Sequence, residues 1–589
     1  MARTPKMKRC PTCQRLESDE ALKFCRVDGA TLVAAAPAIA GEAGTAQLAV
    51  PPDTSEVHTS ILPHRTDFNI NRETSTAVFS PQPPAAATQQ LAKSSSKKTV
   101  IAIAVFILLI AVVIGGYFVA GRFVAARKDK AIESVAVLPF ENKSGNADSE
   151  YLSDGLAESL IYRLSQLSNL KVSPRSSAFR YKGQSTDAEK IGNELGVDAV
   201  MSGRLTQRGD DLVISVDLID VRNKKTLWGE QFQRKMSDLV ATQSEIAAAI
   251  ADKLQLRLSG NDSKGIRKQD TTNNEACQLY LQGRYFWNKR NSENLKKAAE
   301  LLRAATEKDP NYALAYAGLA DCYAVSYYYI GERPREMMPL AKTYAAKAIE
   351  LDPTLAEPHA TLGLVDWLLD RNKAEAQKEH LRAIELNPNY PTAHHWYSRF
   401  LRATGRMDEA WREIKKAEEL DSLSLIIINN IAEIEIDRHG LDAADRDCQR
   451  TLDLDANFWA AHQTLGILRV KQGRYDEALV EAQKSIQLSN RWNASLALLG
   501  HIYAKLGRRS DAEAVIKELE SRYANQTADG RDLAVVYAGL DDKDKAFSWL
   551  DKAAADHSVI LGFLKLEPSL ESLRSDPRWN DLERRAGIK

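Results

Sequence analysis

Three cysteines and an aspartate near the start of the chain have the spacing of ligands for one metal ion. Cys10 and Cys13 form a Cys-x-x-Cys pair, and Cys25 and Asp28 repeat that three-residue separation further along. A Cys-x-x-Cys turn supplies two thiolates to a tetrahedral ion, and a second pair of this kind could complete the set of four ligands. The pattern predicts a structural Zn²⁺ site.

The segment KRCPTCQRLESDEALKFCRVDGATL resembles the short zinc-ribbon heads of bacterial membrane and signalling proteins, in which the second pair often reads Cys-x-x-Asp-Gly. Cys25, Asp28 and Gly29 match that form. A carboxylate is a weaker zinc ligand than a thiolate, so Asp28 could equally be a turn residue. Two alternatives therefore stay open: a reduced pair without metal, and a redox pair, for which the surrounding thioredoxin-like pattern is missing.

A second candidate site lies in the C-terminal half of the chain. It consists of His395, Arg399 and Arg402, with the amides Asn429 and Gln463. Two guanidinium groups, an imidazole and amides suit a carboxylate, because arginine holds a carboxylate by two parallel hydrogen bonds. The cluster predicts a groove for an acidic or C-terminal segment of another polypeptide. The alternative is that both arginines pair with glutamates of their own protein.

The sequence offers little that resembles a catalytic centre. It has no HExxH metal motif, no Gly-rich phosphate loop, no kinase catalytic loop and no recognisable cyclase metal-binding segment. Acidic and basic residues number 79 each, which gives no reason to expect a polyanion as ligand. We therefore predict a protein without catalytic activity and do not expect nucleic acid as its main partner. An unrecognised enzyme is the weakest alternative.

The elements that must position the second site repeat every 34 residues. Positions on this grid include Ala410, Ala444, Ala478, Ala512, Ala546, Gly405, Gly473 and Gly507, with His439-Gly440 shifted by one. This period, with a small residue where two helices cross, is the tetratricopeptide signature. First helices are expected to begin near residues 391, 425, 459, 493 and 527 and to line the concave face. With three looser repeats upstream, the sequence predicts an all-α solenoid of about eight repeats over residues 270–589.

Residues 132–258 alternate strand and helix patterns, which predicts a compact α/β sandwich. Strands are expected at 134–140, 170–172, 199–205, 211–220 and 226–232, and helices at 151–167, 187–195 and 236–256. The stretches SVAVLPFEN, YLSDGLAESLIYRLSQL, GVDAVMSGRL and LWGEQFQR resemble the TolB amino-terminal or FlgO-like module. In the architectures that it resembles, this module stands between an effector domain and a repeat array, as in bacterial adenylate cyclases, kinases and winged-helix activators.

Residues 99–121 form an uncharged apolar run that is long enough to cross a bilayer as a helix. Residues 34–98 are rich in Ala, Pro, Ser, Thr and Gln, which predicts a disordered linker before that transmembrane helix. Small residues four apart, Ala111 with Gly115 and Gly116 with Ala120, would let two such helices approach closely in a homodimer.

Flanking charges do not decide the orientation of this helix, because lysines and arginines stand on both sides. A thiolate site at residues 1–33 persists best in a reducing compartment. We therefore expect a single-pass protein of the inner membrane with a cytoplasmic N-terminus and periplasmic C-terminal domains.

The resulting expectation is a multidomain membrane protein that binds other polypeptides as a scaffold, sensor or assembly factor. Its order is a zinc-ribbon-like head, a linker, one membrane helix, an α/β module and a tetratricopeptide solenoid. The alternative is a regulatory component of a bacterial signalling or transcription pathway, in which the head contacts nucleic acid or an effector. Basic residues around the cysteines support that alternative.

Overall fold

The computed structural model describes residues 132–146, 149–167, 169–184, 187–254, 266, 268–289, 291–329, 334–556 and 558–588, and the dipeptides 8–9, 16–17 and 33–34. The chain forms two compact units, Met1–Ser96 and Lys97–Lys589. In the first unit, strands β1 (Lys8–Arg9), β2 (Leu16–Glu17) and β3 (Val33–Ala34) pair antiparallel in the order β2-β1-β3.

The predicted metal ligands Cys10, Cys13, Cys25 and Asp28 lie outside the described residues, as does the predicted membrane helix at 99–121. The zinc site, the linker and the membrane helix therefore stay predictions. Within the described ranges, none of the helices combines the length and the apolar character that crossing a bilayer requires.

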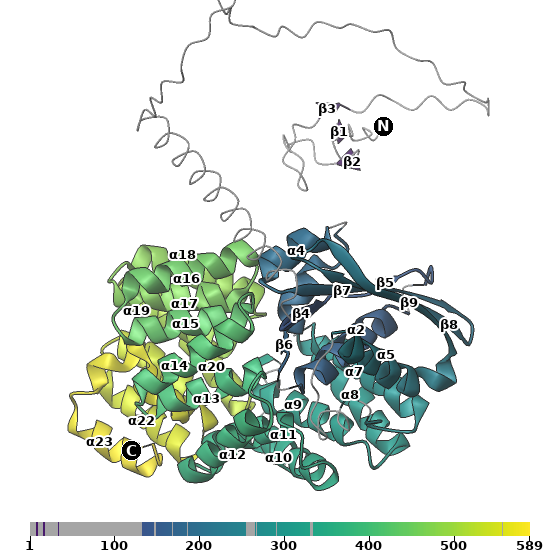
Figure 1. Ribbon diagram of the computed structural model, residues 1–589. Coiled ribbons are helices and arrows are strands. Elements are labelled where there is room, and N and C mark those ends of the chain that lie inside the picture. The colour runs from purple at the N-terminus through teal and green to yellow at the C-terminus, as the bar shows by residue number, and fades with distance from the viewer. Residues whose placement is uncertain are drawn as a thin grey trace, which may run out of the picture. The chain divides into compact units, whose positions relative to one another are not determined.

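The α/β module follows the predicted order of elements (Figure 1). Its strands are β4 (Ser134–Val137), β5 (Glu141–Asn142), β6 (Lys171–Val172), β7 (Ala199–Arg208), β8 (Asp211–Asp220) and β9 (Lys225–Lys235). Its helices are α2 (Glu150–Ser165), α3 (Arg175–Ala178), η2 (Phe179–Tyr181), α4 (Ala188–Leu195), η3 (Met236–Asp238) and α5 (Leu239–Lys253). The sheet has the order β6-β4-β7-β8-β9, with β5 beside β7; β4 is parallel to β6 and β7, and β7, β8 and β9 are antiparallel.

Helices cover both faces of this sheet because its central strands are apolar on both sides. Val135 and Val137 pack in one core with α2 and α5, whereas Ala136 between them packs in a second core with α4. Side chains alternate across a strand, so one short strand serves both cores. The first core continues into the next part of the chain, since it includes Leu281, which packs against Gly155 of α2.

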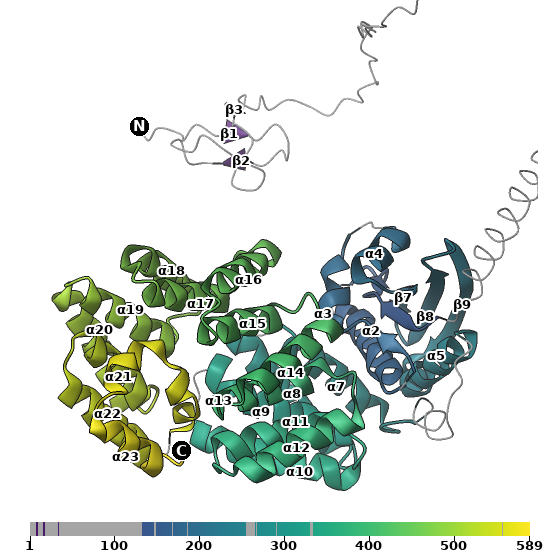
Figure 2. The same cartoon turned by 60° about the vertical axis from the view of Figure 1, so that its left-hand side comes forward.

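The remaining described residues form a solenoid of helical hairpins (Figure 2). The first helices are α7 (Asn274–Trp287), α9 (Ala313–Tyr329), α11 (Glu357–Leu368), α13 (Pro391–Ala403), α15 (Leu425–Asp437), α17 (Trp459–Lys471), α19 (Asn493–Lys505) and α21 (Gly530–Gly539). Their partners are α8 (Ser292–Lys308), α10 (Pro334–Leu351), α12 (Lys373–Leu386), α14 (Met407–Leu420), α16 (Leu441–Leu454), α18 (Tyr475–Leu488), α20 (Arg509–Ala524) and α22 (Lys543–Ala555). The chain then continues through η4 (Val559–Leu566), η5 (Pro568–Leu573) and α23 (Pro577–Arg585).

This arrangement confirms the predicted grid. Helices α13, α15, α17 and α19 begin at the expected residues, and α21 begins at Gly530 rather than near 527. The grid alanines, such as Ala410 and Ala478, have no exposed surface, as close helix packing requires.

In the hairpins from α11–α12 to α21–α22, the turn uses one left-handed residue, and this residue lies on the same grid. Gly405, Gly473 and Gly507 have φ of 81°, 73° and 72°, and His439 has φ of 64°. Gly440, which the sequence pattern predicts as the shifted turn glycine, has φ of −83° instead. The histidine itself therefore adopts the strained conformation.

Replacing His439 by glycine is expected to stabilise the solenoid by about 0.5 to 1 kcal/mol, because glycine adopts this conformation without a steric penalty. Urea unfolding of His439→Gly would measure the gain. The matched control is Gly473→His, which introduces the same strain at the corresponding turn and should lose a similar amount. Equal midpoints for both variants and the parent would contradict the assignment of the turn.

Candidate functional site

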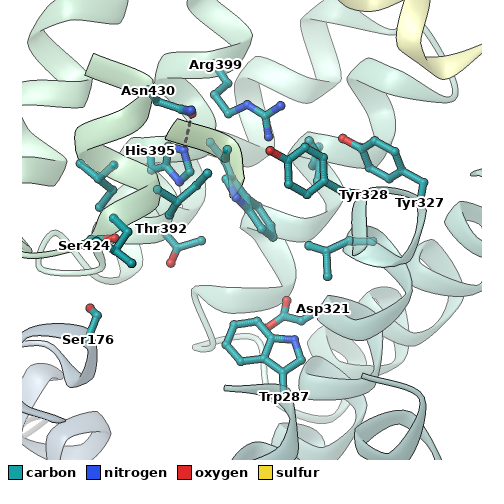
Figure 3. A pocket seen from close by; sticks show the side chains of 18 of the residues that line it. Ser176, Trp287, Asp321, Tyr327, Tyr328, Thr392, His395, Arg399, Ser424 and Asn430 are labelled. Atoms are coloured by element: carbon teal, nitrogen blue, oxygen red, sulfur yellow. Dashed lines mark hydrogen bonds between the residues drawn. The ribbon is translucent and has the colours of Figure 1, made fainter. Parts of the chain in front are cut away.

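A cavity of about 1580 Å³ lies between the α/β module and the concave side of the solenoid. The first helices α13, α15, α17, α19 and α21 all contribute side chains to its wall. The module contributes residues of α2 and α3, among them Ser176 (Figure 3). The prediction that first helices line a concave groove is confirmed by this geometry, and the module closes part of that groove.

Polar contacts hold the module against the first hairpin of the solenoid and against Asp421 further along it. Arg284 of α7 forms an ion pair of 2.8 Å with Glu158 of α2, so the first hairpin is tied to the module. Further along, Ser177 donates a 2.7 Å hydrogen bond to the carboxylate of Asp421, and Ser176 donates a second one. Burial raises the pKa of Asp421, and both hydroxyl donors oppose that rise.

His395 and Arg399 lie where the sequence predicts, on the cavity side of α13 (Figure 3). The His395 Nε2 is 2.7 Å from the Asn430 side-chain oxygen, so its ring is fixed by the next first helix. The Arg399 guanidinium lies over the ring of Phe563, 5.0 Å from its centroid. Among the described residues, no carboxylate lies within ion-pair distance of Arg399. Its charge is therefore available to a ligand.

Arg402 also lines the cavity, but two carboxylates of α15 neutralise it. Its Nε donates a 2.6 Å hydrogen bond to Asp437, and its Nη1 pairs with Glu433. Burial opposes its charge, yet the two carboxylates outweigh burial and raise the pKa of Arg402. The prediction that both arginines are free for a ligand is wrong for Arg402, where the alternative of internal pairing holds.

The two predicted amides behave differently. Gln463 lines the cavity and accepts a 3.3 Å hydrogen bond from Ser485. Asn429 is 1% exposed and donates to Glu433 at 3.2 Å, so it faces the packed interior and not the cavity. The prediction of a groove position for Asn429 is wrong by one residue, because its neighbour Asn430 takes that place.

An aromatic cluster in the wall has no counterpart in the sequence analysis. The ring centroids of Tyr328, Trp459 and Trp492 lie 4.9 to 5.1 Å apart. Trp459 begins the first helix α17 on the grid, whereas Tyr328 comes from the end of α9, upstream of the repeats that keep the 34-residue spacing. Periodicity could indicate that Trp459 is near the groove, whereas nothing in the sequence signals its contact with Tyr328.

Glu357, at the start of α11, lines the cavity with one oxygen that is buried without a hydrogen-bond partner. Burial raises the pKa of Glu357 to about 7, and Arg284 opposes the rise only in part. Because its folded pKa exceeds its unfolded value of 4.5, protonation favours the folded state. Its contribution to stability is therefore present below about pH 4.5 and is lost as pH rises towards 7.

Replacing Glu357 by glutamine is expected to remove this pH dependence. At pH 8 the variant should be more stable than the parent by about 3 kcal/mol, and at pH 4.5 the two should be nearly equal. Urea unfolding at both pH values would measure the difference. A gain of the same size at pH 4.5 and pH 8 would show that ionisation of Glu357 is not its cause.

The described residues contain no group of three or more histidine, cysteine or acidic side chains that could hold a metal ion. The buried thiols Cys277, Cys322 and Cys448 form no disulfide with one another.

Comparison with protein families gives a match over the module. Residues 130–249 match the model described as "HilA/YgeH-like transcriptional regulator, second domain". The resemblance to the TolB amino-terminal or FlgO-like module has no support from this match and stays a prediction.

Two curated proteins resemble longer parts of the chain. "Putative adenylate cyclase 3" of Rhizobium meliloti (strain 1021) is 31% identical over 245 residues, which are 41% of this chain and 42% of that protein. "Transcriptional regulator HilA" of Salmonella typhimurium is 24% identical over 294 residues, which are 49% of this chain and 51% of that protein. The chain thus matches about half or less of the length of these relatives.

The first of these relatives corrects one expectation. The prediction that the protein lacks catalytic activity is contradicted, because a relative at 31% identity is named as an enzyme. The absence of these motifs is weak evidence against catalytic activity, because they represent only a few of the known catalytic patterns.

Solved structures with some likeness to the chain include the Pseudomonas aeruginosa PilF structure, with a TM-score of 0.29 and 21% identity over 37% of this chain and 93% of that one. The Cut9–Hcn1 tetramer structure has a TM-score of 0.37 and 16% identity over 60% of this chain and 71% of that one.

Proposed function

We propose that residues 132–588 are the recognition unit of a regulatory protein, and that this unit binds an extended segment of another polypeptide in the central cavity. The observation that carries this proposal is one arginine of the cavity wall that has no carboxylate partner among the described residues. Arg402 and Arg531 are each paired with two carboxylates, whereas Arg399 faces the cavity without one. A carboxylate of an acidic segment would pair with the Arg399 guanidinium.

The regulatory part of the proposal is supported by the comparisons. The module matches a domain of transcriptional regulators, and a relative over half of the chain is itself named as one. A repeat solenoid offers a long concave surface for polypeptides. Recognition by the cavity would then control an activity elsewhere in the protein or in its complex.

A cavity-filling variant tests this function. Thr392 is half-buried in the cavity wall, and Thr392→Trp should fill the space beside Arg399 and reduce recovery of co-purified proteins at least fivefold. The matched control is Val480→Trp on α18, at a site that is 50% exposed and does not line the cavity. Equal recovery with both variants would contradict binding in the cavity.

For the N-terminal residues we propose the arrangement that the sequence predicts. Residues 99–121 would cross the inner membrane, with the head in the cytoplasm and the recognition unit in the periplasm. Protease digestion of intact cells and of spheroplasts tests this topology, because a periplasmic unit is cleaved only after the outer membrane is opened.

In the second candidate function, the head contacts nucleic acid, which the transcriptional relatives favour. A salt-dependent DNA shift by residues 1–35 would support it.

A peptide of residues 1–35 is expected to bind one Zn²⁺ ion and to fold only with that ion present. If the free energy of Zn²⁺ binding is about 12 kcal/mol and the four ligands contribute equally to it, Cys25→Ser should cost about 3 kcal/mol, or roughly a hundredfold in affinity. Asp19→Asn is the control, because Asp19 is outside the ligand spacing. Titration with a competing chelator measures both. An affinity unchanged by Cys25→Ser would exclude this ligand set.

A further inference from the structure

The C-terminal segment of the chain returns to hairpins that lie far from it in sequence. In a repeat solenoid each hairpin contacts mainly its neighbours. Segment η4, which follows the last hairpin, nevertheless contacts α11 and α13, and η5 contacts α17. Arg371, just after α11, donates a hydrogen bond to the main-chain carbonyl of Ser558, 187 residues away. Packing between successive hairpins does not require such a contact.

One side chain of this segment, Phe563, lines the cavity and packs against side chains of α11 and α13. The ring of Phe563 meets the Trp367 indole edge-on, with centroids 4.8 Å apart. The Arg399 guanidinium covers the same ring at 5.0 Å. Gly562 lies so close to Arg371 that an added Cβ would be 3.2 Å from its Nη1. Trp367, Arg371 and Arg399 therefore form one subsite, which holds an aromatic ring and a main-chain carbonyl.

The charge of this subsite is not matched by its occupant. Among the described residues, neither Arg371 nor Arg399 has a carboxylate within ion-pair distance. The Arg371 Nη1 is buried without a hydrogen-bond partner, and burial lowers the pKa of Arg371. The residues of this segment that pack against Arg371 and Arg399, Gly562 and Phe563, carry no acidic group. The carboxylate of Asp529 raises the pKa of Arg371 but lies beyond ion-pair distance, so a carboxylate within hydrogen-bond distance of this half-buried guanidinium would be stabilising.

We propose that Trp367, Arg371 and Arg399 form a subsite for a partner polypeptide that carries an aromatic side chain next to a carboxylate, and that Phe563 occupies it in the free protein. This inference rests on the proposed function and names the chemistry of the segment bound. A single-stranded nucleic acid also carries aromatic rings beside anions, and it is the alternative occupant that the test below distinguishes.

Binding of short peptides to the full chain in detergent micelles tests the subsite. The probe is a fluorescein-labelled heptapeptide, Ser-Gly-Glu-Phe-Glu-Gly-Ser, measured by fluorescence anisotropy. Phe563→Ala should tighten its binding at least fivefold, because the resident ring no longer competes. Arg371→Gln and Arg399→Gln, each combined with Phe563→Ala, should weaken binding at least fivefold. Peptides with Phe replaced by Ala, or with both Glu replaced by Gln, should bind at least tenfold more weakly.

Phe563 is only partly buried, and circular dichroism of each variant checks that the solenoid stays folded. The inference is overturned if Phe563→Ala leaves the affinity unchanged in a folded protein, or if the Gln peptide binds as tightly as the Glu peptide. It is also overturned if a twelve-nucleotide single strand binds more tightly than the heptapeptide. Failure of the proposed function is distinguishable, because Thr392→Trp would then leave partner recovery unchanged, whatever the peptides do.

Discussion

Replacing Arg402 by alanine is expected to destabilise the solenoid by about 3 kcal/mol, because it leaves Asp437 and Glu433 without their cation. The side chains of Asp437 and Glu433 are 11% and 29% exposed. Because this burial is incomplete, we expect a loss at the lower end of the range of about 3 to 5 kcal/mol for breaking a buried ion pair. Urea unfolding followed by circular dichroism measures it.

The matched control for Arg402 is Arg399, three residues earlier on the same helix. Arg399→Ala removes a contact with an aromatic ring and no ion pair, so its cost should stay below about 1 kcal/mol. Equal losses for the two variants would mean that Arg402 is not held by an internal ion cluster. Arg402 would then be available to a ligand, as Arg399 is.

The second large effect is expected at the junction of the module and the solenoid. Arg284→Ala removes the partner of buried Glu158 and should cost about 3 kcal/mol, although Arg175 still pairs with Glu158 at 3.0 Å. Because the first core of the module continues across this junction to Leu281, calorimetry should also show the unfolding transition broaden or divide into two.

Arg234 provides the control for this prediction. It pairs with Glu245 at 2.8 Å on the surface of the module, where both side chains are at least one third exposed. Arg234→Ala should therefore cost less than about 1 kcal/mol and leave the transition unchanged. A single sharp transition in Arg284→Ala would show that the ion pair does not couple the two parts.

Local patterns predicted the elements of this fold well. The alternation in Asp211–Asp220 gives the bounds of β8, and the 34-residue grid gives the starts of four first helices. Both succeed because the side-chain period follows directly from backbone geometry. The pairing of Arg402 was also within reach, because Glu433 and Asp437 lie 31 and 35 residues later, which is one hairpin further on.

Contacts between distant hairpins could not be predicted in this way. The meeting of Phe563 with Trp367, and of Tyr328 with Trp492, depends on the curvature of the whole solenoid. That curvature sums small rotations between hairpins, and no single segment encodes it. The sequence therefore predicts which face carries the site but not which residues close it.

The most direct test of binding in the central cavity is site-specific photo-crosslinking in the native cell. A photoreactive amino acid would replace Thr392 in the cavity wall or Val480 on the outer helix α18. Binding in the cavity predicts a discrete crosslinked polypeptide at residue 392 that is absent at residue 480. Crosslinks at residue 480 with none at residue 392 would place the partner on the outer surface and contradict binding in the central cavity.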